Sequence, residues 1–218
     1  MYYRPGEPSG LARDPWMMCV VPRPIGWISS ISPEGRINLA PYSFFNAVAE
    51  DPPMVMFASN GAHPHGAKDT ARNVRATGEF VCNMATFALR AAVKHTSAPV
   101  DAKTDEFALA RLEMLASTLV RPPRVAASPI HLECRFVTAL ELPPERGGAP
   151  NTLIVGEVVG IHISDEVIVD GLVDLARFKP LARLGYDRFA SVETSFAVTV
   201  PGGGEPSHQD REAELACQ

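Results

Sequence analysis

Short apolar runs separated by prolines and polar residues dominate the first half of the chain. Each run has the length of a strand rather than of a helix, and several are rich in β-branched or aromatic residues. The run over residues 54–58 does not alternate with polar residues, which predicts burial of both its faces. The pattern therefore predicts strands over residues 18–21, 25–31, 37–40, 54–58 and 80–84.

A turn signal joins two of these runs. In Ser32-Pro33-Glu34-Gly35, proline stands at the second position and glycine at the fourth, which favours a type I turn. We therefore expect residues 25–31 and 37–40 to pair as a hairpin.

Helical patterns occupy the middle of the chain. The first covers residues 68–75, with Asp69 as its expected N-cap and Gly78 just beyond its end. Two further candidates, rich in alanine, leucine and arginine, cover residues 86–95 and 104–115.

Strand patterns return after the helices. Long strands are predicted over 130–142 and 152–163, a short one ends at Asp170-Gly171, and a last one covers 196–200. Because strands and helices do not alternate, a parallel doubly wound sheet is disfavoured. The predicted fold class is mainly β with added helices, an antiparallel barrel with the helices packed outside it.

Composition agrees with this fold class and sets the boundaries. Twenty prolines among 218 residues argue against a helical bundle, because proline breaks helix interiors. Residues 1–17 are polar and read as an arm, 18–200 as one domain, and 201–218 as a polar tail. No stretch approaches 18 apolar residues and the start has no apolar signal-peptide core, so we expect a cytoplasmic protein without a membrane partner.

Charge and cysteine spacing exclude several classes of site. The chain has 20 basic and 25 acidic residues and no run of five like charges, so we expect no nucleic-acid partner. Its four cysteines are too far apart for zinc-ligand pairs, and Cys19, Cys82 and Cys134 are expected to be buried free thiols. His63 and His65 are interpreted as loop histidines, so no metal site is predicted.

Familiar catalytic motifs are missing. No G-x-G-x-x-G follows a strand, and the loop from Gly61 to Lys68 has Ala67 where a phosphate-binding loop needs lysine. No serine lies in G-x-S-x-G, and Asp105-Glu106 is explained as a helix opening. No catalytic acid or base is therefore assigned.

Candidate chemistry is concentrated between residues 22 and 73. The run Lys68-Asp69-Thr70 combines a lysine, a hydroxyl and the free amides of a helix start, which suits an anion. Upstream, apolar residues are interspersed with amides and hydroxyls, and these suit a flat heteroaromatic ring. The same residues also fit an ordinary core and loop, and physical chemistry alone leaves both interpretations open.

Several ordered motifs add a resemblance that extends over residues 18–190. The chain resembles the flavin reductase-like family, FMN-binding split-barrel proteins that include flavoredoxins and the reductase components of two-component monooxygenases. The motifs are Arg23–Ser30, Asn38–Asn46, Asp51–Val55, Lys68-Asp69-Thr70-x-x-Asn73, Gly78–Val81, Pro122–Val125, Asn151–Val158 and Pro180–Gly185.

The resemblance implies a split β-barrel of antiparallel, Greek-key-like topology that binds FMN, with FAD less expected, near a homodimer interface. It implies that the backbone and side chains of Ser43, Phe44, Phe45 and Asn46 meet the ring edge, with Ser29 and Ser30 beside the ring and ribityl chain. Phosphate contacts would come from Ser59, Asn60, Lys68 and Thr70, and later-segment contacts from Arg183 and Tyr186. The remaining predicted contacts are Trp27, Asn38, Tyr42 and Asp69.

The function implied is that of an oxidoreductase that passes reducing equivalents from NADH or NADPH to flavin, or onward to a monooxygenase or another acceptor. A flavin carries hydride chemistry itself, so the missing acid and base are no obstacle. Two alternatives remain open: an FMN-holding electron carrier or flavin-binding module without NAD(P)H activity, and a split-barrel interaction protein without cofactor.

Overall fold

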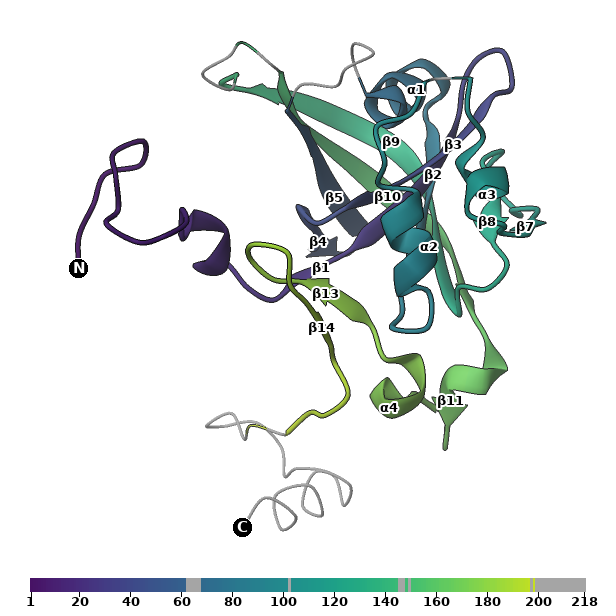
Figure 1. Ribbon diagram of the computed structural model, residues 1–218. Helices are drawn as coiled ribbons and strands as arrows, with labels where there is room; N and C mark the ends of the chain where they lie inside the picture. Colours follow the sequence, from purple (N-terminus) through teal and green to yellow (C-terminus); the bar gives the residue numbers. More distant parts are fainter. Residues whose placement is uncertain (62–67, 102, 145–147, 149, 197, 199–218) are drawn as a thin grey trace.

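One antiparallel sheet of seven strands forms the body of the protein (Figure 1). The computed structural model describes residues 1–61, 68–101, 103–144, 148, 150–196 and 198. Across the sheet the order is β3-β2-β6-β9-β10-β5-β4, with every pairing antiparallel. The strands are β2 (Gly26–Ile31), β3 (Ile37–Tyr42), β4 (Phe45–Glu50), β5 (Pro53–Asn60), β6 (Glu79–Met84), β9 (Ile130–Leu142) and β10 (Asn151–Ile163).

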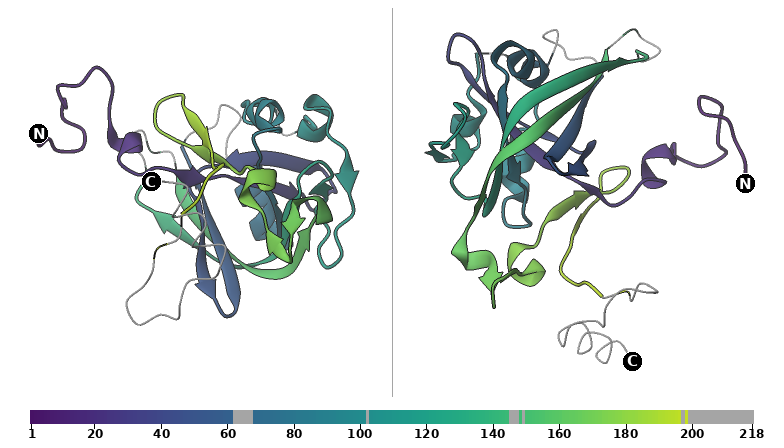
Figure 2. Two further views of the ribbon diagram at one scale, coloured as in Figure 1. Left: turned by 90° about the horizontal axis from the view of Figure 1, so that it is seen from below. Right: turned by 180° about the vertical axis from the view of Figure 1, so that it is seen from behind.

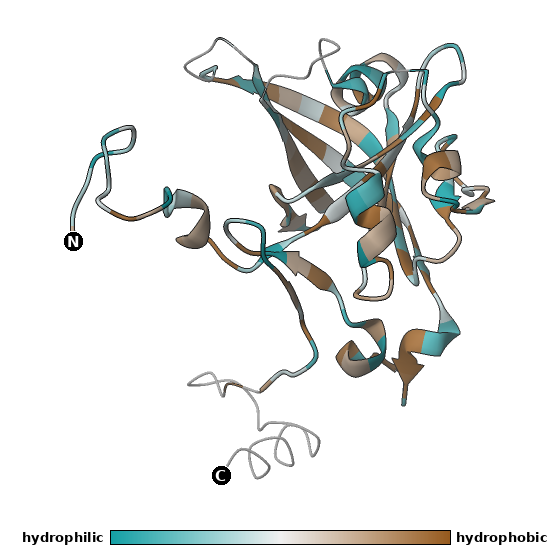
Figure 3. Ribbon diagram, in the orientation of Figure 1, coloured by the Kyte–Doolittle hydropathy of each residue, from teal (hydrophilic) through white to brown (hydrophobic). Residues whose placement is uncertain are grey.

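The predicted hairpin and the two long strands are confirmed. Gly35 N donates to Ser32 O at 2.9 Å and Gly35 has φ +85°, so the turn closes as its sequence predicts. Strands β9 and β10 run side by side as one long hairpin (Figure 2). From Asn151 to Val158 of β10, half-buried and buried residues alternate, because one face of the hairpin covers the core. Figure 3 shows hydrophobic residues, in brown, along the strands of the sheet.

The route of the chain from β5 to β6 gives the sheet its Greek-key-like order. These strands are consecutive in sequence but β9 and β10 lie between them in the sheet. Helix α1 (Asp69–Thr77) is part of this crossover and packs on β2, so the helix N-terminus lies beside the end of β5. As predicted, α1 stops at Gly78, which has φ +76° and donates its N–H to Val74 O at 2.8 Å.

Two apolar clusters lie on opposite faces of β2. Ile28 packs with Phe57, Phe80 and Ile154 inside the curved sheet. Its neighbour Trp27 packs outside, in a second cluster that includes Leu39, Phe107 and Val125. Successive side chains of a strand point to opposite faces, so β2 is buried on both sides. The prediction of two-sided burial for 54–58 was wrong, because Met54 and Met56 are only half-buried.

Long-range pairing shortens the other predicted helices. The expected helix over 86–95 is only α2 (Arg90–His95), because Thr86 bridges to Pro180 and Phe87 N donates to Lys179 O at 2.9 Å. The expected helix over 104–115 is only α3 (Glu106–Leu109), since β7 (Met114–Leu115) pairs with β8 (Arg124–Val125). Lys68, not Asp69, is the N-cap of α1.

The predicted strand over 18–21 was also wrong. A 3₁₀ turn, η1 (Trp16–Met18), leads into bends there. The chain bends because the Arg23 guanidinium donates hydrogen bonds to the carbonyls of Met17 and Val20, at 2.7 and 2.5 Å. Cys19 is consequently exposed, whereas Cys82 and Cys134 are buried as expected. A second sheet follows instead, in which β13 (Leu181–Arg183) pairs with both β1 (Arg23–Pro24) and β14 (Phe189–Ser191).

The remaining elements lie late in the chain. The short strand ending near Gly171 is confirmed as β11 (Ile168–Val169), paired with β12 (Leu172–Val173) between η2 (Asp165–Val167) and α4 (Leu175–Phe178). Phe196 and Val198 belong to no strand, while 197 and 199–218, including the predicted tail, lie outside the described residues. Within the described chain, no helix combines the length and apolar character needed to cross a membrane.

Close packing under β10 gives a stability test. A Cβ added at Gly156 would lie 2.4 Å from Phe80 Cζ and 3.1 Å from the Arg135 carbonyl, whereas at Gly160 its nearest contact would be Leu119 Cδ1 at 3.4 Å. We expect Gly156→Ala to lower the free energy of unfolding by about 1–3 kcal/mol through overpacking, measured by urea titration. Gly160→Ala is the matched control on the same strand, and equal losses in both variants would contradict the packing argument.

Candidate functional site

Two adjoining cavities lie at the end of the sheet where β3 meets α1 and α2. The smaller, about 520 Å³, is lined by β3, the end of β5, the start of α1, the loop after α2, and α3; we name it the polar cavity. The larger, about 1100 Å³, is lined by the N-terminal arm, α2 and the β13–β14 hairpin; we name it the basic cavity. Pro41, Ser43 and Ser97 line both, so the two cavities share a wall.

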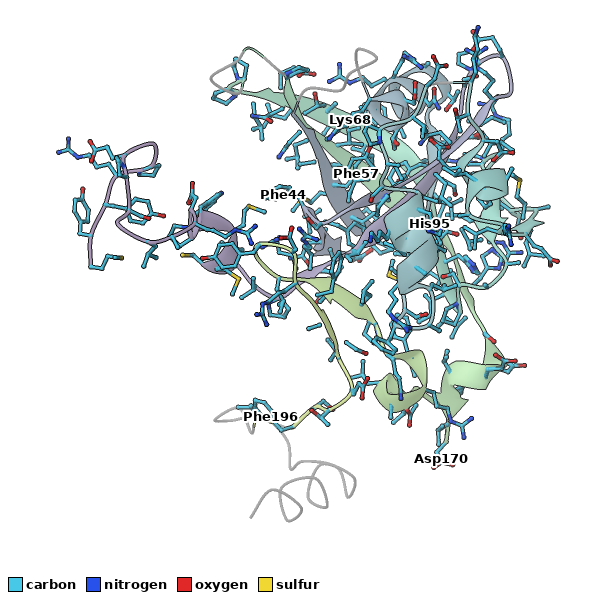
Figure 4. All side chains as sticks on the ribbon, in the orientation of Figure 1. Phe44, Phe57, Lys68, His95, Asp170 and Phe196 are labelled. Carbon is cyan, nitrogen blue, oxygen red and sulfur yellow. The ribbon has the colours of Figure 1, made fainter. Side chains whose placement is uncertain are left out.

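The polar cavity brings together half of the predicted cofactor contacts. They come from three separate stretches of the chain, which the pairing of β3 with β2 and the crossover through α1 place side by side. Lys68 and Phe44 are labelled in Figure 4. The predicted residues that line this cavity are Asn38, Tyr42, Ser43, Phe44, Asn60, Lys68, Asp69 and Thr70.

Hydrogen-bond donors gather where α1 begins. Among the described residues no side chain caps the helix, and the first amides of any helix lack partners within it. The Lys68 ammonium donates to the Asn60 carbonyl, which holds the cation at this end of the cavity. Asn38 Nδ2 donates to Thr70 Oγ1 at 2.8 Å and fixes the hydroxyl there. A cation, a hydroxyl and helix amides together suit a phosphate group.

Two carboxyl groups line the same cavity, and when ionised they would repel an anion. Asp69 forms an ion pair with Arg72 one turn along the helix. Glu106 is buried and accepts a hydrogen bond from Leu39 N at 3.1 Å. Burial, aided by the charges of Asp69 and Asp105, raises the pKa of Glu106 to about 7. Near neutral pH much of the Glu106 population is therefore uncharged, which limits the repulsion.

Tyr42 and Asn60 complete the polar lining. Burial raises the pKa of Tyr42 to about 12, despite hydrogen bonds to Thr70 and Ser59, so the phenol stays protonated and acts as a donor. Asn60 Oδ1 is buried and has no hydrogen-bond partner among the described residues. An unpaired buried acceptor needs a donor, and the hydroxyls of a ribityl chain are of that kind. These residues thus fit a phosphate-bearing cofactor with hydroxyl groups.

Other predicted contacts lie outside both cavities. Trp27, Ser29 and Ser30 are fully buried on β2, where each has a protein partner. Trp27 Nε1 donates to Thr96 Oγ1 at 2.8 Å, Ser29 Oγ to the Pro123 carbonyl, and Ser30 Oγ accepts from Asn73 at 3.2 Å. Phe45 and Ser59 are likewise buried, while Asn46 is exposed on β4. The physical reason is that β2 is covered on both faces, which leaves its hydroxyls to structural bonds.

Arg183 and Tyr186 line the basic cavity and not the polar one. The guanidinium of Arg183 lies over the Phe189 ring, 4.6 Å from its centroid, and donates to the Tyr186 carbonyl. Arg13 lies 4.6 Å from the Tyr186 ring centroid and forms an ion pair with Asp187 at 3.3 Å. The structure therefore separates these two predicted contacts from Lys68 and Thr70, with Ser43 between the two cavities.

Sequence reasoning missed several residues of the site. Glu106 was explained as a helix opening, and its burial depends on β3 passing over α3. The loop 96–100 after α2 carries no motif, although Thr96 is held by Trp27 of the Arg23–Ser30 motif. Arg23, which lines the basic cavity, opens the same motif, so the motif was the signal that could have identified it as a site residue. His63 and His65, interpreted as loop residues, lie outside the described residues.

Comparison with known proteins now identifies the family. The model of the flavin reductase-like domain matches residues 17–180. The chain belongs to the flavin reductase-like family. An uncharacterized protein of Aquifex aeolicus is 34% identical over 167 residues, which cover 76% of this chain and 82% of the relative.

Solved structures agree with the fold of this family. Nitrilotriacetate monooxygenase component B from Bacillus cereus is 28% identical, with a TM-score of 0.81 over 91% of this chain and 98% of that one. A Shewanella frigidimarina protein with a split barrel domain is 20% identical, with a TM-score of 0.70 over 82% of this chain and 86% of that one. The predicted antiparallel split barrel of the flavin reductase-like family is thus confirmed.

The pKa of Glu106 gives a pH-dependent prediction. Its carboxyl favours the protonated form when folded, so the protein loses stability as pH rises from about 4.5 to about 7. Glu106→Gln keeps an acceptor for Leu39 N but cannot ionise. We expect the variant to match the wild type near pH 4.5 and to exceed its free energy of unfolding by up to about 3 kcal/mol at pH 8.

Urea unfolding at a series of pH values measures this difference. Glu113→Gln, at an exposed position, is the control and should change the free energy of unfolding by less than about 0.5 kcal/mol throughout. A gain in Glu106→Gln that is the same at every pH would show that the carboxyl does not titrate as described.

Proposed function

We propose that the protein is an FMN-binding oxidoreductase of flavin reductase type, which passes reducing equivalents from NADH or NADPH to flavin or onward to an acceptor. One observation carries the proposal: in a chain of this family, the uncapped start of α1, Lys68 and Thr70 meet the unpaired Asn60 Oδ1 in one cavity. The same residues that the sequence singled out for a phosphate-bearing cofactor therefore form a site that fits one.

The residues of the polar cavity have distinct tasks in this proposal. Lys68, Thr70 and the first amides of α1 hold the phosphate, and Asn60 accepts from a ribityl hydroxyl. Ser43 and Phe44, at the wall toward the basic cavity, position the ring edge. When bound, FMN supplies the hydride-accepting chemistry. Tyr42 stays protonated and Glu106 accepts from Leu39 N, so the proposal assigns neither residue to proton transfer from substrate.

We also propose a homodimer with the cofactor near its interface. The edge strand β4 is exposed at every position after Phe45, Val48 among them, and the outer part of β9 exposes Val137, Leu140 and Leu142. An open edge strand and exposed apolar side chains on the same sheet both favour a partner surface. Light scattering of the purified protein tests this, and a mass equal to one chain would exclude it.

The proposed acceptor is a partner enzyme or free flavin. Component B of nitrilotriacetate monooxygenase, a protein similar to this one, belongs by name to such an enzyme system. We place the protein in the cytoplasm, without a membrane or nucleic-acid partner. The electron-carrier alternative shares the same cofactor site and differs only in whether NAD(P)H reduces the flavin.

A spectroscopic experiment tests the proposed activity. We expect the purified protein to bind FMN with a yellow colour, and the flavin absorbance to bleach when NADH or NADPH is added without oxygen. The yellow protein bleached only by dithionite would indicate the carrier. A colourless protein that does not bind added FMN would contradict the proposed function.

Lys68→Ala tests the phosphate contact. Loss of a hydrogen bond from a charged donor costs about 1.5–3 kcal/mol, so we expect the FMN dissociation constant to rise about 10- to 150-fold, measured by fluorescence quenching of free FMN. Lys103→Ala is the control, since Lys103 is exposed and lines neither cavity. Equal affinity in Lys68→Ala and wild type would place the phosphate elsewhere.

A further inference from the structure

The basic cavity concentrates positive charge in an otherwise acidic protein. The whole chain has a formal net charge of −5. Among the described residues that line this cavity, however, only Asp14 and Asp187 are acidic, and the basic residues outnumber them. The basic side chains of the lining are Arg13, Arg23, Arg90, Lys94 and Arg183. A concave surface with such an excess of one charge attracts ligands of the opposite charge.

Arg23 is the most constrained of these cations. It is 6% exposed, and its terminal nitrogens donate to the carbonyls of Met17, Val20 and Leu184 at 2.7, 2.5 and 2.9 Å. No carboxylate pairs with it in the described part of the chain, and its Nε is buried without a hydrogen-bond partner there. A buried charge of this kind is costly unless an opposite charge comes close to it.

A second guanidinium, that of Arg183, lies in the lining of the same cavity. Arg183 is close enough to Arg23 that its charge, added to burial, lowers the pKa of Arg23. Among the described residues Arg183 forms no ion pair, and its guanidinium donates a hydrogen bond to the Tyr186 carbonyl. Two like charges facing one cavity become favourable when an anion lies near both.

The rest of the lining is aromatic and apolar. Arg183 lies over the Phe189 ring, and Arg90 lies 4.1 Å from the centroid of the Phe87 ring. Ile25, Val93 and Leu181 supply further apolar surface. A ligand that matches both parts of this lining has a flat ring joined to a carboxylate or phosphate.

The position of the cavity connects it to the proposed function. It shares Pro41, Ser43 and Ser97 with the polar cavity, so a ligand there lies beside the proposed cofactor. The family model spans residues 17–180, whereas Arg13, Asp14 and the segment 181–191 lie outside it. Part of the outer wall therefore comes from residues beyond the matched domain, and Arg183 itself stands in the Pro180–Gly185 motif of the resemblance.

We propose that the basic cavity binds a small aromatic carboxylate, with Arg183 holding the carboxylate and Arg23 supplying the buried positive charge beside it. As the site of the reactant that exchanges electrons with the cofactor, it rests on the proposed function. The single anionic group and the ring of such a ligand match the two guanidiniums and the apolar lining. Binding of the anion itself needs no cofactor, so the two proposals can fail separately.

Calorimetric titration tests the proposal on the full chain, with and without FMN. The probes are benzoate and oxidised NADP⁺, each compared with its uncharged counterpart, benzamide and nicotinamide. We expect benzoate to bind at least tenfold more tightly than benzamide, and Arg183→Gln to weaken benzoate binding roughly tenfold or more. Arg183→Lys should retain most of the affinity, because it keeps the charge.

Two controls separate the site from general charge effects. Arg36→Gln removes an arginine that pairs with Glu34 at 2.9 Å in the β2–β3 turn and lines neither cavity, so it should leave binding unchanged. Lys94→Gln removes a cation from the α2 wall without altering the β13–β14 hairpin and should also weaken binding, which covers the case that Arg183→Gln does not fold.

Each outcome decides for or against the proposal. Benzoate binding that depends on Arg183 supports it, whereas NADP⁺ binding that depends on Arg183, without benzoate binding, overturns it and assigns the cavity to the dinucleotide. Absence of benzoate binding overturns the proposal, as does benzoate binding that is equal in wild type and Arg183→Gln. FMN affinity should be the same in wild type and Arg183→Gln, and a parallel loss of FMN affinity would return Arg183 to the cofactor site and overturn the assignment made here.

Discussion

The burial of β2 on both faces is the constraint on which the site depends. A strand that packs an apolar core on each side must satisfy its polar side chains with nearby protein groups, since water does not reach them. On β2 these bonds run outward to other elements: Trp27 to Thr96, Ser29 to Pro123, and Ser30 to Asn73. One strand therefore fixes the loop after α2, the segment before β8 and the helix α1. Two of these three elements form walls of the polar cavity.

The polar cavity contains acidic residues, but an ion pair and a raised pKa reduce their negative charge. Lys68 and the start of α1 provide positive potential, while Asp69 is paired with Arg72 and Glu106, with a pKa of about 7, is only partly ionised near neutral pH. The burial that raises the pKa of Glu106 comes from packing α3 against β3, so the same contact that closes the cavity also reduces its negative charge.

The sequence predicted local features well and long-range ones poorly. Prolines and a turn signal mark where the strands end. The hairpin at Ser32–Gly35 and the long strands β9 and β10 could therefore be predicted. The helix over 86–95 was overextended because Phe87 bonds to Lys179, a partner far along the chain. The residues proposed to bind phosphate could be predicted because Lys68, Asp69 and Thr70 follow one another, whereas the basic cavity was missed because its walls come from residues 13–17, 87–97 and 181–191.

Arg23 shows why a motif residue can have more than one role. In sequence it opens the Arg23–Ser30 motif, and in the structure it holds the bend at 17–20 and the Leu184 carbonyl together. Leu184 lies beyond the matched domain of residues 17–180 and the bend lies at its start, so this motif residue positions two walls of the basic cavity. The cost of burying its charge is lowest when an anion occupies the neighbouring space. One guanidinium therefore links the structure of the basic cavity to the ligand proposed for it.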